Sequence, residues 1–390
     1  MPDSPLRLLA LSHDAGRTGA PIGLLAFLQW WRGQSGQPIP SILRSPGPLA
    51  PSFQELGPCL ILGNTWLHRT RAGRRLLARL PRAIHQQRRA ILDFVRRQAP
   101  AVIYANTLTH GALLDLLGPL GLPTVSHAHE LEYWITRAGP ENLRLVRQHT
   151  HHYVAAAEAV RQHLIAPLGI PSDQISVVYE HIARLPELPA SSTRQSERAR
   201  LGIPPDALVI GGCGAEHWRK GRDLIPSLLQ AIRRHLPGRD VRFLWIGRPG
   251  NPEEERTLHY DLRQTGTADA YATTGEVRDP FPIYAALDAF ALLSREDPFP
   301  LACLEAAAAG CPVVCFEGAG GMPEFTRQGC GLSVPYLDVD ALATRLAWLD
   351  AHPDAARQMT TLARQQVATD HLPERTGPRL LGILQRIARG

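Results

Sequence analysis

Residues 289–316 read AFALLSREDPFPLACLEAAAAGCPVVCF, and this stretch decides the fold. The apolar residues 289–293 have the character of a β-strand, and the polar stretch after them predicts a loop. Pro300 suits the first position of a helix, and residues 301–309 are almost all strong helix formers. Gly310 then ends the helix before a short β-branched run. Strand, loop, helix and strand in this order predict one parallel crossover unit.

Two carboxylates follow the first strand of this unit. Asp297 lies in the predicted loop, and Glu305 follows eight residues later, in the predicted helix. Ligands of open α/β sheets bind at the carboxyl ends of parallel strands, where a helix N-terminus also favours anions. We therefore expect both carboxylates to face one crevice that suits a ligand with hydroxyl groups and phosphate.

The length and composition indicate a soluble globular protein with two domains. The chain has 390 residues, of which 44% are hydrophobic and 20% charged, and a single core rarely serves a chain of this length. No apolar run approaches the roughly 18 residues of a membrane span, and residues 6–12 lack the basic flank and the length of a signal peptide. We expect a cytoplasmic protein. Its six cysteines show no paired spacing and are expected to be reduced and buried.

Apolar runs alternate with helical stretches along the chain, which predicts an α/β fold with parallel sheets. Residues 185–200 are rich in Pro, Ser and charged residues without an apolar period, and we interpret them as an interdomain linker. We therefore predict two doubly wound, Rossmann-like domains, residues 1–184 and 201–368, that face each other across a crevice. The apolar stripe of residues 369–390 predicts a C-terminal helix that packs back on the first domain.

The chain carries a single lysine, Lys220, among 42 Lys and Arg residues. It lies beside Arg219 in a loop bracketed by Gly214 and Gly221. A compact ammonium group approaches a phosphate as a point charge, which Arg cannot replace. The two cations would form a clamp for a diphosphate whose charge grows as it leaves, and the alternative is an ordinary basic loop. The glycine spacing mimics the start of a dinucleotide fingerprint, but His217 occupies the third glycine position, so NAD and FAD are discounted.

The first half of the chain offers two weaker candidates. Gly16, Thr18 and Gly19 follow the first predicted strand, and their backbone amides could face a ligand. His127 and His129 end a later strand with a spacing that could hold a metal, but the hydrolases that use it need further His and Asp ligands. We therefore expect no metal, and His129 better suits a hydrogen bond to a sugar hydroxyl or to phosphate.

A basic segment runs from Arg69 to Arg97, with ten arginines against one acid, Asp93. The apolar residues between them predict an amphipathic helix, broken near Pro81. Its basic face suits an anionic membrane surface or a lipid-phosphate acceptor, and a solvated helix is an equally good interpretation. No zinc, homeodomain or RNA-binding motif accompanies the charge, so nucleic acid is not expected as a partner.

Together these motifs resemble the GT-B glycosyltransferases, specifically the retaining family 4. That family carries an acidic residue, seven residues and a Glu, then a Gly-Pro-Val-Val strand and a Gly-Gly turn. Here the pattern reads Asp297 and Glu305, then GCPVV at residues 310–314 and a Gly-Gly pair at residues 320–321. The resemblance covers residues 211–336 closely and the first half only in patches.

The resemblance implies a nucleotide diphosphate sugar in the second domain and a saccharide or lipid-linked acceptor in the first, without cofactor or metal. By position it implies Glu305 for the ribose hydroxyls, Asp297 or Glu296 for the sugar hydroxyls, Arg219 and Lys220 for the phosphates, and His129 for the donor sugar near its anomeric carbon. Further donor contacts would come from Phe299, Pro300, Leu301, Gly214, Gly320 and Gly321, and an acceptor or phosphate loop from Gly16, Thr18 and Gly19. Because the first acid is Asp rather than the commoner Glu, which of Glu296 and Asp297 reaches the sugar stays open.

The implied activity is retaining sugar transfer to a saccharide or glycolipid acceptor, in bacterial polysaccharide or lipopolysaccharide biosynthesis. No side chain is a nucleophile poised beside a base, so catalysis would rest on positioning and charge stabilisation, with the leaving diphosphate helping to deprotonate the acceptor. Two alternatives stay open. One is a nucleotide-sugar epimerase or phosphorylase of the same architecture, and the other is a non-catalytic protein that binds membrane or a partner through its basic face.

Overall fold

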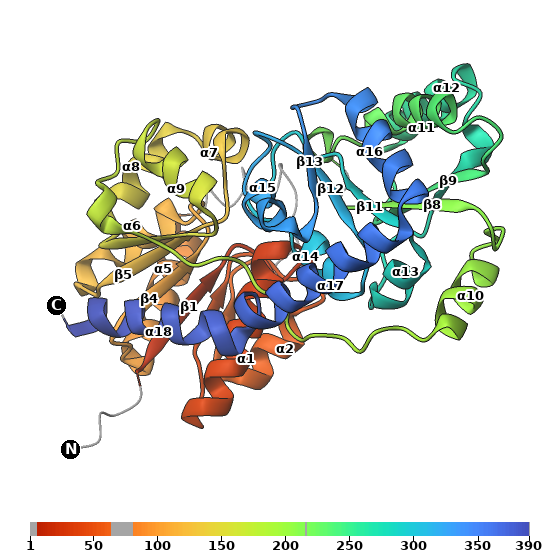
Figure 1. The fold of residues 1–390 in the computed structure, drawn as a ribbon. Coiled ribbons are helices and arrows are strands. Elements are labelled where there is room, and N and C mark those ends of the chain that lie inside the picture. The colour runs from red at the N-terminus through yellow and green to blue at the C-terminus, as the bar shows by residue number, and fades with distance from the viewer. Residues whose placement is uncertain (1–5, 64–80, 215–216, 390) are drawn as a thin grey trace. The chain divides into compact units, whose positions relative to one another are not determined.

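The computed structural model describes residues 6–63, 81–214 and 217–389, and Figure 1 traces the chain through them. The chain divides into two compact units. Unit 1 comprises Met1–Ala183 with Pro373–Gly390, and unit 2 comprises Arg184–Leu372. Each unit has its own parallel sheet and its own hydrophobic core, which confirms the predicted α/β fold class with two Rossmann-like sheets.

Unit 1 is built on a seven-stranded parallel sheet in the order β3-β2-β1-β4-β5-β6-β7. Its strands are β1 (Leu8–Ser12), β2 (Ser41–Leu43), β3 (Cys59–Ile61), β4 (Val102–Asn106), β5 (Thr124–Ala128), β6 (His152–Ala155) and β7 (Ile175–Val177). The central strands β1 and β4 are buried at every position. They are apolar or aromatic up to their last residue, as parallel strands covered on both faces are, and each ends in a polar residue.

The helices of unit 1 include one from the far end of the chain. They are α1 (Gly19–Ser35), α2 (Ala50–Leu56), α5 (Pro81–Gln98), α6 (Gly111–Leu117), α7 (Glu132–Ala138), α8 (Pro140–His149), α9 (Glu158–Ile165) and α18 (Pro373–Arg389). Leu380 and Leu384 of α18, blue in Figure 1, lie in the core of unit 1 beside α1. Trp30 of α1 packs so closely on Gly377 that a Cβ there would lie 2.5 Å from its ring. The apolar stripe of α18 is therefore covered by unit 1.

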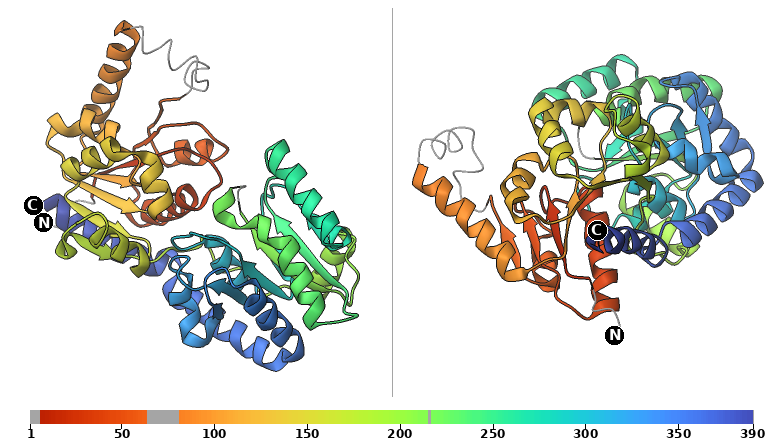
Figure 2. Two further views of the ribbon diagram at one scale, coloured as in Figure 1. Left: turned by 90° about the horizontal axis from the view of Figure 1, so that it is seen from above. Right: turned by 90° about the vertical axis from the view of Figure 1, so that its left-hand side faces the viewer.

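Helix α5 contains the part of the basic segment that the structure describes. It begins at Pro81, where a break was predicted, and residues 69–80 lie outside the described residues. Ile91, Phe94 and Val95 are buried, whereas the side chains of four arginines are exposed, namely Arg88, Arg89, Arg96 and Arg97. Figure 2 shows the first turns of α5, in orange, extending past the sheet of unit 1.

Unit 2 is built on a six-stranded parallel sheet in the order β10-β9-β8-β11-β12-β13. Its strands are β8 (Leu208–Cys213), β9 (Val241–Ile246), β10 (Tyr271–Thr273), β11 (Ala289–Leu292), β12 (Val313–Phe316) and β13 (Leu332–Val334). Its helices are α10 (Ser191–Arg200), α11 (Ile225–His235), α12 (Pro252–Gln264), α13 (Phe281–Ala286), α14 (Leu301–Ala308), α15 (Met322–Phe325), α16 (Val339–Ala351) and α17 (Pro353–Asp370). The predicted crossover unit is thus confirmed as β11, α14 and β12.

The interpretation of residues 185–200 as an interdomain linker is wrong for residues 191–200, which form α10 within unit 2. Helix α10 has no apolar stripe, and two arginines hold it against the rest of unit 2. Arg198 is 4% exposed, and it donates to the carbonyls of Ala286 and Ala207 and to Asp288 Oδ2 at 2.7 Å. Arg194 also pairs with Asp288. Buried guanidinium groups replace the apolar contacts that sequence periodicity detects.

The second domain boundary also differs from the prediction. Helix α17 continues to Asp370, and unit 2 continues to Leu372. The C-terminal segment that packs on unit 1 therefore begins at Pro373 and not at residue 369.

Among the helices of the described chain, none combines the length and the apolarity that crossing a bilayer would need. All six cysteines are free thiols.

Candidate functional site

The predicted donor residues of unit 2 come from loops that follow neighbouring strands. β8 and β11 pair at the centre of the sheet, and β12 pairs with β11 on its other side. The loop after β8 carries Arg219 and Lys220, and the loop after β11 carries Asp297. Because the carboxyl ends of parallel strands lie at one edge of a sheet, these side chains meet although 77 positions separate Lys220 from Asp297.

Asp297 pairs with both cations. Its Oδ2 lies 2.5 Å from Lys220 Nζ, and its Oδ1 lies 3.4 Å from Arg219 Nη1. Ser294 Oγ donates to Oδ2 at 3.0 Å. Burial alone would raise the pKa of Asp297, but the charges of Lys220 and Arg219 together hold it below its usual value. The carboxylate is therefore ionised at neutral pH and keeps both cations at the edge of the sheet.

The loop after β12 fixes the backbone of Asp297. Asp297 N donates to Ala319 O at 2.6 Å, and Gly321 N donates to Pro298 O at 2.8 Å. Gly320 has a φ of 139°, and a Cβ there would lie 1.8 Å from Asp297 O. Only glycine fits at that position. Gly320 and Gly321 thus position the acidic loop, and the amide of Gly321 is already used within the protein.

Glu305 lies on α14 beside Tyr284 of α13. Tyr284 OH donates to Glu305 Oε2 at 3.1 Å. Burial raises the pKa of Glu305 to about 7, the Tyr284 hydrogen bond acts in the opposite direction, and the charge of Asp279 adds to the rise. A carboxyl group with this pKa changes its charge near neutral pH, and only the ionised form accepts hydrogen bonds from hydroxyl groups at both oxygens.

The other predicted donor residues differ in what they can offer. Phe299 is buried and its ring stacks on His371 at 5.3 Å, so its side chain belongs to the core. Pro300 is the N-cap of α14 and has no N–H, whereas Phe299 and Leu301 each carry a backbone N–H. The side chain of Leu301 is buried. The expectation that all three residues bind the donor is therefore narrowed to two backbone amides.

Gly214 and Glu296 help to position Lys220 and Arg219. A Cβ at Gly214 would lie 3.1 Å from the Lys220 side chain, so the glycine leaves room for it. The Glu296 carbonyl accepts a hydrogen bond from Arg219 Nη1, and the Glu296 side chain is half-buried. Of the two acids, it is the carboxylate of Asp297 that pairs with Lys220 and Arg219 in this structure.

Arg295 links the loop after β11 to the loop after β8, and this role was not predicted from the sequence. Its backbone N donates to Arg219 O at 2.7 Å, and its guanidinium pairs with Asp223 at 2.7 Å. The guanidinium also lies over the ring of Trp218, 5.0 Å from its centroid. Arg295 stands two positions before Asp297 in the quoted stretch, but nothing in the pattern indicated that it spans to the other loop.

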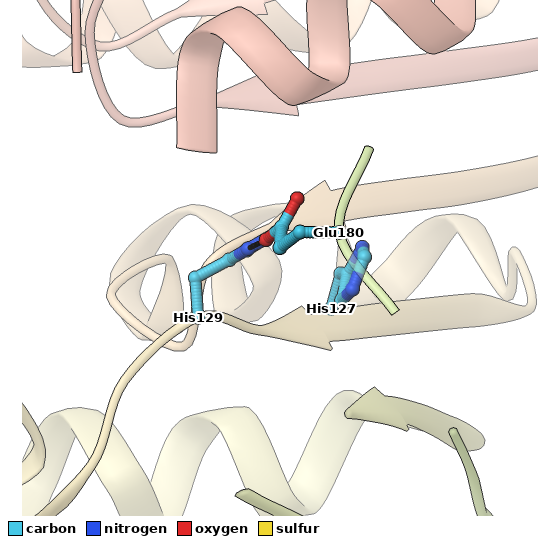
Figure 3. Close-up of side chains that lie close together, drawn as sticks. All are labelled: His127, His129 and Glu180. Carbon is cyan, nitrogen blue, oxygen red and sulfur yellow. Dashed lines mark hydrogen bonds and ion pairs between the residues drawn. The ribbon is translucent and has the colours of Figure 1, made fainter. Parts of the chain in front are cut away.

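At the edge of the sheet of unit 1, His129 follows β5 and Glu180 follows β7, as Figure 3 shows. His129 Nδ1 bonds to Glu180 Oε1, and His129 Nε2 lies 2.8 Å from Asn106 Oδ1. Asn106 Oδ1 is the acceptor, because the amide nitrogen of Asn106 donates to Ala20 O at 2.8 Å. Both ring nitrogens of His129 therefore carry a proton.

The charge on His129 follows from its partners. Burial alone would lower its pKa, but the charge and the hydrogen bond of Glu180 raise it. His129 is thus a buried imidazolium whose two N–H groups are both used within unit 1. The resemblance implied that His129 contacts the donor sugar near its anomeric carbon. In this arrangement, a sugar hydroxyl reaches a ring nitrogen only by displacing Asn106 or Glu180.

His127, His129 and Glu180 also form a group that could hold a metal ion. One ligand atom from each lies within 4.8 Å of the others. His127 Nδ1 is 2.6 Å from Tyr104 OH, and the imidazole rings of His127 and His129 have centroids 4.0 Å apart and are tilted by 39° to each other. The hydrogen bonds of His129 and His127 give the cluster a role without a metal. That the protein needs no metal stays a prediction.

The loop predicted to bind acceptor or phosphate precedes α1. Gly16 N donates to Asp14 Oδ1 at 2.8 Å. Thr18 is the N-cap of α1 without a side-chain cap bond, and Gly19 is the first helical residue. No acidic residue lies in the first turn. The positive end of the α1 dipole is therefore left without a negative side chain of its own helix.

Four polar residues at the edge of unit 1 were missed, namely Arg44, Asn106, His110 and Glu180. Asn106 ends β4, and Arg44 directly follows β2. A polar residue at the carboxyl end of an apolar run was a usable signal in both cases. Glu180, three positions after β7, gave the same signal more weakly. The sequence alone did not show which of these residues lie close together.

Comparisons with known proteins agree with the two-unit architecture. A family model described as Glycosyltransferase Family 4 matches residues 41–182, and one described as Glycosyl transferases group 1 matches residues 204–351. Among the curated relatives, D-inositol 3-phosphate glycosyltransferase of Corynebacterium kroppenstedtii is 29% identical over 60% of this chain and 53% of its own length. A GDP-mannose-dependent alpha-(1-6)-phosphatidylinositol monomannoside mannosyltransferase of Mycolicibacterium smegmatis is 29% identical over 70% of this chain and 74% of its own length. The chain spans about half the length of several curated relatives that it matches.

Solved structures share the fold over nearly the whole chain. HepE of Anabaena in complex with UDP-glucose superposes with a TM-score of 0.80 at 18% identity, covering 97% of this chain and 99% of that one. WaaG, a glycosyltransferase involved in lipopolysaccharide biosynthesis, gives a TM-score of 0.69 at 12% identity, covering 97% and 99%. At such identities the likeness shows the fold, which is GT-B.

Proposed function

The chain belongs to the family 4, group 1 glycosyltransferases, and we propose that it transfers a sugar from a nucleotide diphosphate sugar to a saccharide or glycolipid acceptor with retention of anomeric configuration. One observation carries the donor half of this proposal. Lys220 and Arg219 are paired with Asp297 at the edge of the sheet of unit 2. Two cations held at a ligand-binding edge suit the diphosphate of such a donor.

Glu305 supports a nucleotide rather than a bare diphosphate as the ligand. Its carboxyl group belongs to the same crossover unit and hydrogen-bonds to Tyr284, which leaves Oε1 for the vicinal hydroxyls of a ribose. HepE was crystallised with UDP-glucose, and the Mycolicibacterium smegmatis relative uses GDP-mannose. We propose a nucleoside diphosphate sugar donor of the same general kind.

In the proposed reaction, the bond from the anomeric carbon to the diphosphate breaks and a bond to the acceptor oxygen forms on the same face. The acceptor proton passes to an oxygen of the departing diphosphate. Lys220 and Arg219 stabilise the charge that grows on this leaving group, and Asp297 holds both cations in place before the reaction. Catalysis then depends on positioning and on preorganised charge, with no cofactor and no metal required.

We further propose a role in bacterial polysaccharide, lipopolysaccharide or glycolipid assembly. One relative is named a lipopolysaccharide core biosynthesis glycosyltransferase, from Rhizobium meliloti, at 34% identity over 38% of this chain. The exposed arginines of α5 provide a basic face for an anionic membrane surface on the cytoplasmic side. Sedimentation with vesicles of phosphatidylglycerol, with phosphatidylcholine vesicles as control, tests this placement. Equal binding to both vesicles would contradict it.

The stereochemical outcome tests the proposal directly. The enzyme is incubated with UDP-, GDP- and ADP-sugars and a panel of saccharide and lipid-linked acceptors, and the product is analysed by proton NMR. We expect a product whose anomeric coupling matches that of the donor, and transfer that is lost in Lys220→Ala. A product of inverted configuration would refute the retaining mechanism.

A further inference from the structure

Three side chains with unsatisfied hydrogen-bonding groups gather at the carboxyl edge of unit 1. The strand register sets the last residues of β2, β1 and β4 side by side. Arg44 directly follows β2 and His13 directly follows β1. His110 is the N-cap residue of α6, in the loop after β4. Three adjacent loops therefore deliver a guanidinium and two imidazoles to one edge.

Within the described residues, the side chain of Arg44 makes one hydrogen bond, from Nη1 to Thr109 O, the carbonyl directly before His110. Over the described ranges, its Nε and Nη2 have no hydrogen-bond or ion-pair partner. The side chain is half-buried, and burial lowers its pKa although Asp14 and Glu130 act against this. A desolvated guanidinium without an ion pair is costly, so an anion that paired with it would be bound strongly.

His110 is 0% exposed, and neither of its ring nitrogens has a hydrogen-bond partner in the part of the chain that the structure describes. The Asn106 carbonyl is close enough to favour the protonated ring but does not meet hydrogen-bond geometry. More than about nine-tenths of buried polar groups in proteins are paired, and leaving one unpaired costs about 1–3 kcal/mol. The charges of Arg44 and His13 both act on the ring and lower its pKa further. A ligand that joins Arg44 to His110 would satisfy both.

His13 adds a third donor beside them. Its Nδ1 is buried and unpartnered among the described residues, and its Nε2 lies 3.5 Å from Asp14 Oδ2. The N-terminus of α1, six residues further along the chain, brings partial positive charge to the same loop. The carboxylates nearby have partners of their own. Asp14 accepts from Gly16 N, and Glu130 accepts from the amides of residues 108 and 129.

We propose that this edge of unit 1 binds a phosphoryl group of the sugar acceptor, with Arg44 as the anchor and His110 and His13 as further donors. The inference rests on the proposed function, because it names the class of acceptor that the transferase uses. A tetrahedral oxyanion offers several acceptor oxygens to donors from three loops, whereas a carboxylate offers two oxygens in one plane. The phosphoryl group can belong to a soluble sugar phosphate or to a lipid phosphate.

The pH dependence of this binding has a definite sign. Burial first, and then the charge of Arg44, lower the pKa of His110, and burial also lowers that of His13. The imidazolium of His129 and the carboxyls of Asp14 and Glu130 face the same edge. A bound phosphoryl dianion favours the protonated imidazoles, so binding of the dianion places protons on the histidines, and the Kd calculated for the dianion falls as the pH falls.

Titration of inorganic phosphate into the full chain with 15N-labelled histidine tests the site. The ring signals of His110, assigned with His110→Gln, should shift saturably in the wild type, and the Kd calculated for the phosphate dianion should be at least tenfold lower at pH 6 than at pH 8. Arg44→Met should weaken the response at least tenfold, and Arg44→Lys should restore part of it. Arg7→Met is the matched control, because Arg7 precedes β1 at the opposite edge of the sheet, and it should behave as wild type.

Three results would overturn the proposal. The first is that the His110 signals do not respond to phosphate, and the second is that they respond equally in Arg44→Met. The third is that acetate at matched ionic strength acts as strongly as phosphate. Glycerol 3-phosphate and dihexanoyl phosphatidic acid then separate the two sources: binding of either supports the site and identifies the source, and binding of neither overturns it. Because nucleotide binding to unit 2 is measured separately, failure here leaves the proposed donor site standing.

Discussion

Replacing Glu305 by Gln should stabilise unit 2 at alkaline pH while it weakens donor binding. Burial raises the pKa of Glu305 from 4.5 to about 7. Below pH 4.5 the group is protonated in the folded and the unfolded states, and the full stability of the wild type is present. As the pH rises through 7, the folded state must hold a desolvated charge, and this stability is lost.

The rise in the pKa of Glu305 sets the amount of folding stability that is lost at high pH. One pKa unit corresponds to about 1.36 kcal/mol, so a rise from 4.5 to about 7 destabilises the wild type by at most about 3 kcal/mol above pH 8. Because Glu305 keeps some contact with solvent, we take this figure as the upper limit. Glu305→Gln removes the charge but keeps an acceptor oxygen for Tyr284 OH.

Hydrogen exchange of the β11 and β12 amides, followed by mass spectrometry, measures the opening free energy of unit 2 alone. We expect Glu305→Gln to gain about 2–3 kcal/mol over the wild type between pH 5 and pH 8.5. Glu187→Gln is the matched control, since Glu187 is exposed in the same unit and should show no gain. A difference between wild type and Glu305→Gln that does not change with pH would refute the buried carboxyl group as its cause.

Four further outcomes follow from the structure. Lys220→Ala should lower kcat by roughly two to three orders of magnitude, because a preorganised charge donor to the leaving group is lost, and steady-state kinetics with an unchanged kcat would exclude this role. Glu305→Ala should chiefly raise the donor KM, since a ribose contact changes little in the transition state, and a pure loss in kcat would contradict it. Arg198→Met should destabilise unit 2 by about 3 kcal/mol in urea unfolding, because the carbonyls of Ala286 and Ala207 lose their buried donor; a change below about 0.5 kcal/mol, the range of ordinary surface substitutions, would show that α10 is held in another way. Dialysis against EDTA should leave the activity unchanged, and a loss restored by a divalent cation would show that a metal is needed.

The sequence predicted the central crossover unit well because its signals are local. The glycine and proline that end α14 and the apolar runs of β11 and β12 determine these elements without help from distant residues. The pairing of Lys220 with Asp297 was not predicted, since the contact depends on the order of strands in the sheet; the resemblance only assigned both residues to the same donor. Helix α10 was not predicted, because buried arginines hold it to the core and it has no apolar stripe.

The edge of unit 1 was predicted least well, and the reason is geometric. Glu180 lies 51 positions from His129 in the sequence, and no spacing rule connects them. His110 sits in a short turn of polar and small residues that reads as an ordinary helix start. That its ring nitrogens lack partners among the described residues becomes clear only when the surrounding strands are in place. A local sequence pattern cannot identify residues whose role depends on contacts among three loops.

Calorimetric titration of UDP, GDP, ADP and CMP into the wild type, Lys220→Ala and Lys220→Arg tests the central claim most directly. We predict selective binding of one nucleoside diphosphate by the wild type, and at least tenfold weaker binding by both variants, since the guanidinium of Arg cannot take the place of the ammonium group beside Asp297. A ligand at about 100 times its Kd stabilises the folded protein by roughly 2.7 kcal/mol, so thermal unfolding should show the same selectivity. If no nucleotide binds, or if all three proteins bind equally, the donor site assigned to Lys220, Arg219 and Asp297 is wrong.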